Sequence, residues 1–222
     1  MKKVLYFLAA CFVFVSCSKD TANPSTEDKV SDYFPISAGN YWKFKDSASG
    51  SVTILSATGA QKSMNGSAYY VVNTSNASGT VEAYVLKKNN FYSFVNLFGT
   101  STVNGVLDFR YLNDTMGINS SWNYDAGSIN SIPATVKGKI VARSISKTVN
   151  NVVYNNVIFS QMSLFYDYSS FGMGLLEVGR YDIYSAEGVG IIKVQSSLPT
   201  NPLDPTSSRL YICSNLVEYS IK

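Results

Sequence analysis

The sequence contains no histidine, and this absence excludes more chemistry than any other feature of its composition. Without histidine there is no Ser-His-Asp triad, no Cys-His pair and no imidazole for general acid-base catalysis. Zinc sites built from clusters of histidine and cysteine are excluded as well, because the chain has only three cysteines. We therefore expect a protein that is not an enzyme, with no metal site and no cofactor.

Cysteine and charge are both scarce. Cys11 and Cys17 lie near the amino terminus, which leaves Cys213 as the single thiol of the folded part, so we expect no intramolecular disulfide. Charged residues make up 15% of the chain, and its net charge is +3. A nucleic-acid-binding surface needs a basic stripe, so we expect no nucleic-acid partner. Polarity comes instead from serine, threonine, asparagine and sixteen tyrosines.

No apolar run is long enough to cross a bilayer as a helix. The longest, Val4 to Val15, follows Lys2 and Lys3 and falls short of the roughly 20 residues that a spanning helix needs. A short basic segment followed by an apolar run of this length is typical of a signal peptide. The sequence therefore predicts a signal peptide over residues 1–16.

Two cysteines in this segment are candidates for lipidation. Cys11 ends the segment LAAC, which resembles a bacterial lipobox, but cleavage there would leave an apolar tail at the new amino terminus. Cys17 follows the full apolar run and precedes the polar residues SKD. We expect Cys17 to carry the diacylglycerol and palmitate, with residues 17–32 as a lipidated flexible tether. The alternative is an ordinary secretory signal cleaved near residues 16–18.

From residue 33 onward the pattern indicates strands and turns. Asn65-Gly66 and Asn89-Asn90 are hairpin signals, and Asn155-Asn156 is expected to interrupt a β-rich run. Residues 134–142 alternate between apolar and polar, which is the period of a strand with one wet face. No stretch of ten residues has a helical period. We predict one all-β domain over residues 33–222, an antiparallel barrel, half-barrel or sandwich of about ten strands.

The last strand is expected over residues 210–222. Its alternation predicts that Val217, Tyr219 and Ile221 point inward. Cys213 has the same parity, so we expect it to be a small core residue.

Two segments together resemble a family of uncharacterised exported lipoproteins of the Bacteroidetes type. The segment YFPISAGNYWKF (33–44) is similar to the opening "YFPL-x-x-GN-x-W-x-Y" of that family, and EGVGIIKV (187–194) is similar to its late segment "GVG-[LI]-[VI]-K". The resemblance implies an antiparallel β-fold and an extracytoplasmic location, and it implies no catalytic residue. In physical terms, the glycines of the second segment would allow a bulge or a close backbone approach, with a ligand-contacting loop as the alternative.

Two weaker site signals remain. Asp167, Glu177, Asp182 and Glu187 cluster in the sequence, and a glycosidase needs two carboxyl groups about 5 to 10 Å apart, although solvated acids are the more ordinary interpretation. Three residues each follow an aspartate and precede an apolar residue, which resembles the acceptor site of Bacteroidetes O-glycosylation; they are Thr21, Ser47 and Thr115.

These observations predict a lipoprotein of the cell envelope, anchored through its lipid to the outer membrane, on the periplasmic face or the cell surface. We expect a non-catalytic interaction or scaffold domain with a protein or glycan partner. The alternative is a binding module for a carbohydrate, stacked on tyrosines and Trp122, or for a small apolar ligand.

Overall fold

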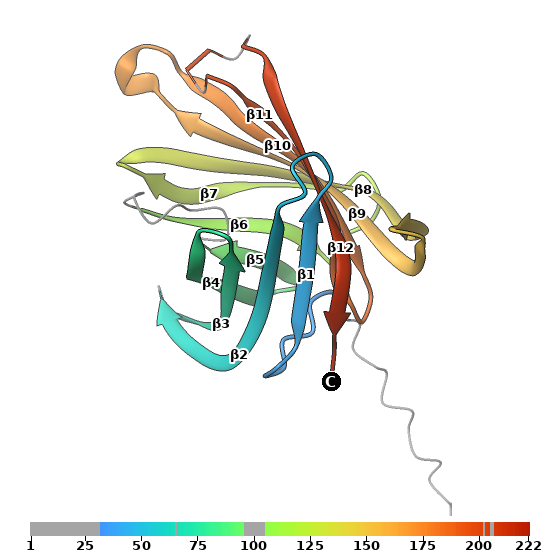
Figure 1. Ribbon diagram of the computed structural model, residues 1–222. Coiled ribbons are helices and arrows are strands. Elements are labelled where there is room, and N and C mark those ends of the chain that lie inside the picture. The colour runs from blue at the N-terminus through green and yellow to red at the C-terminus, as the bar shows by residue number, and fades with distance from the viewer. Residues whose placement is uncertain (1–31, 65, 96–104, 202, 205–206) are drawn as a thin grey trace, which may run out of the picture. The chain divides into compact units, whose positions relative to one another are not determined.

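The computed structural model describes residues 32–64, 66–95, 105–201, 203–204 and 207–222, which form a closed antiparallel barrel (Figure 1). Each strand pairs with the next one along the chain, and the last strand pairs with the first. The strands are β1 (Tyr41–Asp46), β2 (Val52–Met64), β3 (Ser67–Asn76), β4 (Gly79–Lys88), β5 (Phe91–Val95), β6 (Gly105–Asn113), β7 (Ser121–Ile129), β8 (Ile132–Val149), β9 (Val152–Asp167), β10 (Leu175–Ala186), β11 (Gly190–Pro199) and β12 (Arg209–Ser220).

A single turn of 3₁₀-helix, Ser169–Phe171, interrupts the strands of the described ranges. Within those ranges no helix has the length and apolar character needed to traverse a bilayer. The predicted all-β antiparallel fold is confirmed, with twelve strands instead of about ten. The strands absent from the sequence prediction are β7 and β10. In β7 the alternation of Trp122, Tyr124 and Ala126 was an available signal, because the side chains of a strand alternate between its two faces.

Asparagine pairs form two of the tight hairpins. Asn89 and Asn90 have φ of 50° and 65°, and Asn150 and Asn151 have φ of 49° and 64°. Positive φ at both central residues is what a type I′ turn requires, and asparagine tolerates it. The pair Asn155-Asn156 was expected to interrupt a β-rich run, but it lies inside β9. Asn156 (φ 50°) is part of an irregularity in the pairing of β9 with β8. That prediction was wrong because a bulge accommodates the same backbone conformation without ending the strand.

One large cluster of apolar side chains fills the barrel interior. The predicted inward face of β8 is confirmed, since Ala134, Val136 and Ile140 are all buried. Gly138 belongs to this face and has no room for a side chain, because a Cβ there would lie 2.2 Å from the ring of Trp122. The largest fully buried side chains are Trp42, Tyr92, Tyr111, Phe94 and Leu112.

The parity predicted for β12 is correct only after a bulge in that strand. Tyr219 pairs with the buried Trp42 and Ile221 packs against the core, as expected. Before the bulge the prediction was wrong, because Leu216 is buried while Val217 is 43% exposed. The register passes from Lys43–Glu218 to Phe44–Leu216, so Val217 is the extra residue of a bulge. A slip of one residue turns side chains to the opposite face, which the uninterrupted alternation could not reveal.

Cys213 is also misplaced by the predicted parity. It pairs with the exposed Gln195 on the outer face and is half-buried there. Its backbone N–H donates to Asp46 Oδ2 at 3.2 Å. Cys213 is therefore a residue of the outer face and not of the core.

The two ends of the barrel differ in what they contain. We call the end where the described chain begins at Asp32 and finishes at Lys222 the base; in Figure 1 it carries the carboxyl terminus. The opposite end, which we call the rim, carries the connections β1–β2, β3–β4, β9–β10 and β11–β12. Because the strands are antiparallel and sequential, every odd-numbered strand runs from the base to the rim.

Candidate functional site

The two segments that carry the family resemblance meet at the base. Phe34 stacks on Trp42 with ring centroids 4.5 Å apart. The indole Nε1 of Trp42 donates to the backbone oxygen of Val189 at 2.6 Å, and Gly188 N donates to Asp32 O at 2.8 Å. Asp32, the final residue of the predicted tether, is thus hydrogen-bonded to the connection between β10 and β11. Segments about 150 residues apart in sequence close one end of the barrel together.

Gly190 shows why this contact needs glycine. Its φ is +106°, and a Cβ at this position would lie 3.0 Å from the ring of Phe34 and 3.3 Å from Nε1 of Trp42. A side chain is therefore disfavoured both by the backbone conformation and by space. The close backbone approach expected of this segment is confirmed, and its partners are core residues of the same chain.

A polar network lies beside this closure. The hydroxyl of Tyr92 donates to Asp114 Oδ2 at 3.0 Å and accepts from Tyr33 N at 3.2 Å, and Lys87 Nζ lies 3.0 Å from the same Asp114 oxygen. Burial raises the pKa of Tyr92 far above its ordinary value, and it does the same for Tyr111. Both phenols stay neutral at physiological pH, which suits a structural network and not a nucleophile.

The four clustered carboxylates bond to separate partners. Glu177 binds Arg180 and Arg209, with closest contacts of 2.8 and 3.2 Å. The other three each bond to a different residue: Asp167 to Ser169, Asp182 to Gln161 and Glu187 to Asn156. Asp167, the last residue of β9, and Glu187, in the connection after β10, also lie at opposite ends of β10. No metal-binding group of three or more acidic or cysteine side chains occurs in the part of the chain that the structure describes.

The predicted modification sites fall into two groups. Cys17 and Thr21 lie outside the described residues. Ser47 and Thr115 are both exposed in connections between strands. The hydroxyl of Ser47 accepts a hydrogen bond from Asn215 at 2.8 Å, and that of Thr115 donates to Asn113 Oδ1 at 3.0 Å. Exposure, which an acceptor of O-glycosylation requires, is met at both positions.

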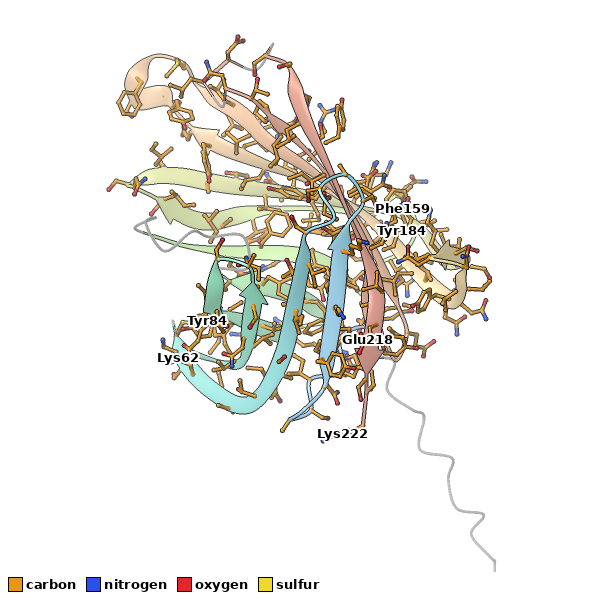
Figure 2. All side chains as sticks on the ribbon, in the orientation of Figure 1. Lys62, Tyr84, Phe159, Tyr184, Glu218 and Lys222 are labelled. Atoms are coloured by element: carbon orange, nitrogen blue, oxygen red, sulfur yellow. The ribbon has the colours of Figure 1, made fainter. Side chains whose placement is uncertain are left out.

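Many aromatic side chains pack across neighbouring strands instead of facing solvent. Phe159 on β9 stacks on Tyr184 of β10 with centroids 4.4 Å apart, and Lys62 Nζ donates to the hydroxyl of Tyr84 at 2.9 Å (Figure 2). Trp122, expected as a stacking platform for sugars, is only 8% exposed. That stacking role is not available to it, because its ring lies over Gly138 inside the barrel.

The pairing of β6 with β7 is unusually short. Backbone pairing covers only Gly105–Leu107 with Gly127–Ile129. Further along, the hydroxyl of Tyr124 accepts from Arg110 N at 2.5 Å and donates to Asp108 O, and Trp122 Nε1 donates to Arg110 O at 3.2 Å. Side chains of β7 thus satisfy the backbone of β6 where the ladder is interrupted. We call these four residues (Asp108, Arg110, Trp122 and Tyr124) the seam.

The rim carries most of the exposed large apolar side chains of the described residues. Thirteen large apolar side chains are exposed, and eight of them lie at the rim: Val52, Val81, Phe171, Met173, Leu175, Leu203, Leu210 and Tyr211. Leu210 pairs with Leu198, which packs against the core, yet Leu210 is 55% exposed. The core-facing side of β12 is therefore reached by solvent at this end. An end of the barrel that exposes many apolar groups is a candidate interaction surface.

Sequence reasoning missed the rim and the seam. The rim had a local signal, because FGMGLL (171–176) places apolar residues in a glycine-rich turn, where polar residues are usual. The seam had no such signal, since it depends on which strands become neighbours.

Among the comparisons with known proteins, only the one with solved structures finds a similar protein, and it supports the fold alone. No protein-family model matches the chain, and no curated protein is significantly similar to it in sequence. Its structure is similar to the crystal structure of a candidate lipoprotein from Parabacteroides distasonis ATCC 8503. The TM-score is 0.52 at 11% identity, and the alignment covers 86% of this chain and 99% of the other. The chain shares an all-β architecture with that protein.

Proposed function

We propose that this protein is a lipoprotein of the cell envelope whose barrel is a non-catalytic interaction domain that binds a protein partner at the rim. The lipid is attached to Cys17 and anchors the protein to the outer membrane. The observation that carries the proposal is the concentration of exposed apolar side chains at the rim. The bacterial neighbour described as a candidate lipoprotein is compatible with this assignment.

The geometry of the chain supports the role of the rim. Asp32, the first described residue, bonds to Gly188 at the base, so the described chain begins at the end opposite the rim. We propose that a lipid anchor linked to this end leaves the rim accessible to a partner. Phe171 and Tyr211, 66% and 71% exposed, are the aromatic groups that a partner with an apolar face would bury.

The chemistry of the described residues supports a non-catalytic role. The sequence has no histidine, and the clustered carboxylates bond to separate partners. The buried tyrosines have raised pKa values, so they are poor bases and nucleophiles at neutral pH.

Metabolic labelling with palmitate tests the anchor. Cys17→Ser is expected to abolish labelling and to release the protein from the membrane fraction. Cys11→Ser, the matched control, is expected to keep both. Retained label in the Cys17→Ser variant would refute the assignment to Cys17.

Site-specific photo-crosslinking in cells tests the rim. A photoreactive residue at Phe171 is expected to give one saturable protein adduct, and the same residue at Val153, which is 61% exposed at the base, is expected to give none. Leu175→Ser and Leu210→Ser together should remove the Phe171 adduct. Equal adducts from both positions would contradict a binding site at the rim.

We also propose O-glycosylation at Thr21, Ser47 and Thr115. Intact-mass measurement of protein from its native host should show glycan mass that falls stepwise when each residue is changed to alanine. Ser49→Ala, in the same turn as Ser47, is the control that leaves the mass of the glycan unchanged. A mass equal to that of the lipidated polypeptide alone would rule out the modification.

A further inference from the structure

The charged groups of the seam are incompletely used by the barrel. Asp108 and Arg110 are two residues apart on β6, so their side chains share one face. Arg110 reaches Asp108 Oδ2 only through long contacts, 3.4 Å from Nε and 3.5 Å from Nη2. The other carboxylate oxygen, Oδ1, is buried and has no hydrogen-bond partner among the described residues. An ordinary structural ion pair would satisfy this oxygen, because a buried carboxylate oxygen without a hydrogen bond is unfavourable.

Aromatic rings hold the guanidinium of Arg110 in place. Its central carbon lies 4.2 Å from the ring centroid of Tyr124 and 5.7 Å from that of Phe91. Phe91 in turn meets Trp122 edge to face at 5.7 Å. The side chain of Arg110 is nevertheless 39% exposed, and that of Asp108 is 24% exposed. The rings thus orient the fork of N–H groups while one side of it stays open to solvent.

The charge balance of the pair selects the class of ligand. The carboxylate of Asp108 compensates Arg110 and would repel an anion, while Arg110 would repel a cation. An apolar ligand would cover both charged groups without offering either of them a hydrogen bond. A neutral ligand with adjacent hydroxyl groups accepts from the guanidinium and donates to the carboxylate at the same time.

We propose that Asp108 and Arg110 form a binding site for a neutral oligosaccharide on the side wall of the barrel. The site lies at the seam between β6 and β7, and it is separate from the rim. It uses hydrogen bonds from a charged pair held by aromatic rings, and it does not use the exposed stacking platform that the sequence predicted at Trp122.

A glycan array carrying neutral, sulfated and sialylated oligosaccharides tests the site with the full lipidated chain in detergent. The wild type is expected to bind neutral glycans, and calorimetry then gives the affinity for the best of them. Asp108→Asn removes the charge without changing shape, and Arg110→Lys keeps the charge without the fork. Each is expected to weaken binding at least tenfold, with the thermal unfolding midpoint within a few degrees of the wild type.

Lys137→Ala is the matched control. Lys137 lies 4.6 Å from the ring centroid of Phe165, so this variant removes a comparable cation–aromatic contact elsewhere on the barrel. It is expected to bind the glycan within twofold of the wild type. The proposal is overturned by a wild type that binds no glycan on the array, by binding confined to acidic glycans, or by an affinity that neither seam variant changes.

Discussion

At the base, aromatic side chains meet each other and the backbone, and at the rim the same kinds of side chain meet solvent. Phe34 is 2% exposed and stacks on Trp42, which bonds to the loop before β11. Phe171 is 66% exposed in the connection between β9 and β10. Both are phenylalanines in segments outside the strands, so residue type alone does not decide their roles.

The difference separates stability from interaction. A buried phenylalanine stabilises the fold through burial and packing, and an exposed one contributes to a binding surface. The buried contacts at the base therefore stabilise the barrel, whereas the exposed side chains at the rim contribute little to its stability. Of the four predictions below, the first concerns the interior that both ends share and the other three test this division, from the largest effect to the smallest.

Raising the pH is expected to destabilise the barrel, because tyrosines buried in its interior would have to lose their protons. Burial raises the pKa of Tyr181 to about 12 and raises those of Tyr92, Tyr111 and Tyr124 further above the ordinary value of 10. The unfolded chain therefore loses protons between pH 10 and 12 that the folded chain retains, so stability falls as the pH rises through this window. Tyr181 alone accounts for about 3 kcal/mol. Unfolding midpoints from pH 8 to 12 check this, and a constant midpoint would contradict it.

Phe34→Ala is expected to destabilise the barrel by about 3–5 kcal/mol, because it removes a buried ring stacked on Trp42. Urea unfolding followed by tryptophan fluorescence gives this value. A loss below about 1 kcal/mol would mean that the base closes without the opening segment.

Gly190→Ala is expected to cost about 1–3 kcal/mol, because the added Cβ would crowd Phe34 and Trp42 and the backbone φ is positive. Gly174→Ala is the matched control, since its φ is also positive (70°) but no atom lies within 4 Å of the added Cβ. A comparison of the two urea midpoints separates crowding from backbone strain. Equal losses would show that the contact at the base contributes nothing.

Phe171→Ala is expected to change the free energy of unfolding by no more than about 0.5 kcal/mol, because little of its surface is buried. The same variant is expected to lower partner binding at the rim. Photo-crosslinking with the photoreactive residue moved to Leu175 measures this loss. A stability loss comparable to that of Phe34→Ala would remove the distinction between the two ends.

Much of the fold could be predicted from local patterns. The asparagine pair at Asn89-Asn90 predicted a hairpin, and the alternation over residues 134–142 predicted an inward face, because turn conformation and strand period depend on neighbouring residues. The parity of Cys213 and Val217 could not be predicted, since it depends on a bulge opposite β1. The seam could not be predicted at all, because Arg110 contacts Tyr124 only when β6 and β7 lie side by side in the barrel.

The sequence by itself determined the secondary-structure class, the absence of histidine chemistry and the candidate lipid anchor at Cys17, because each depends on composition or on a short segment. The tertiary structure decided that Phe34, Trp42 and Gly190 close the base, that Trp122 is buried and that Phe171 is exposed. Burial and contact across the barrel arise from strand order and register, and these bring together residues far apart in the chain. The same aromatic residue type can therefore serve as core at one end and as surface at the other.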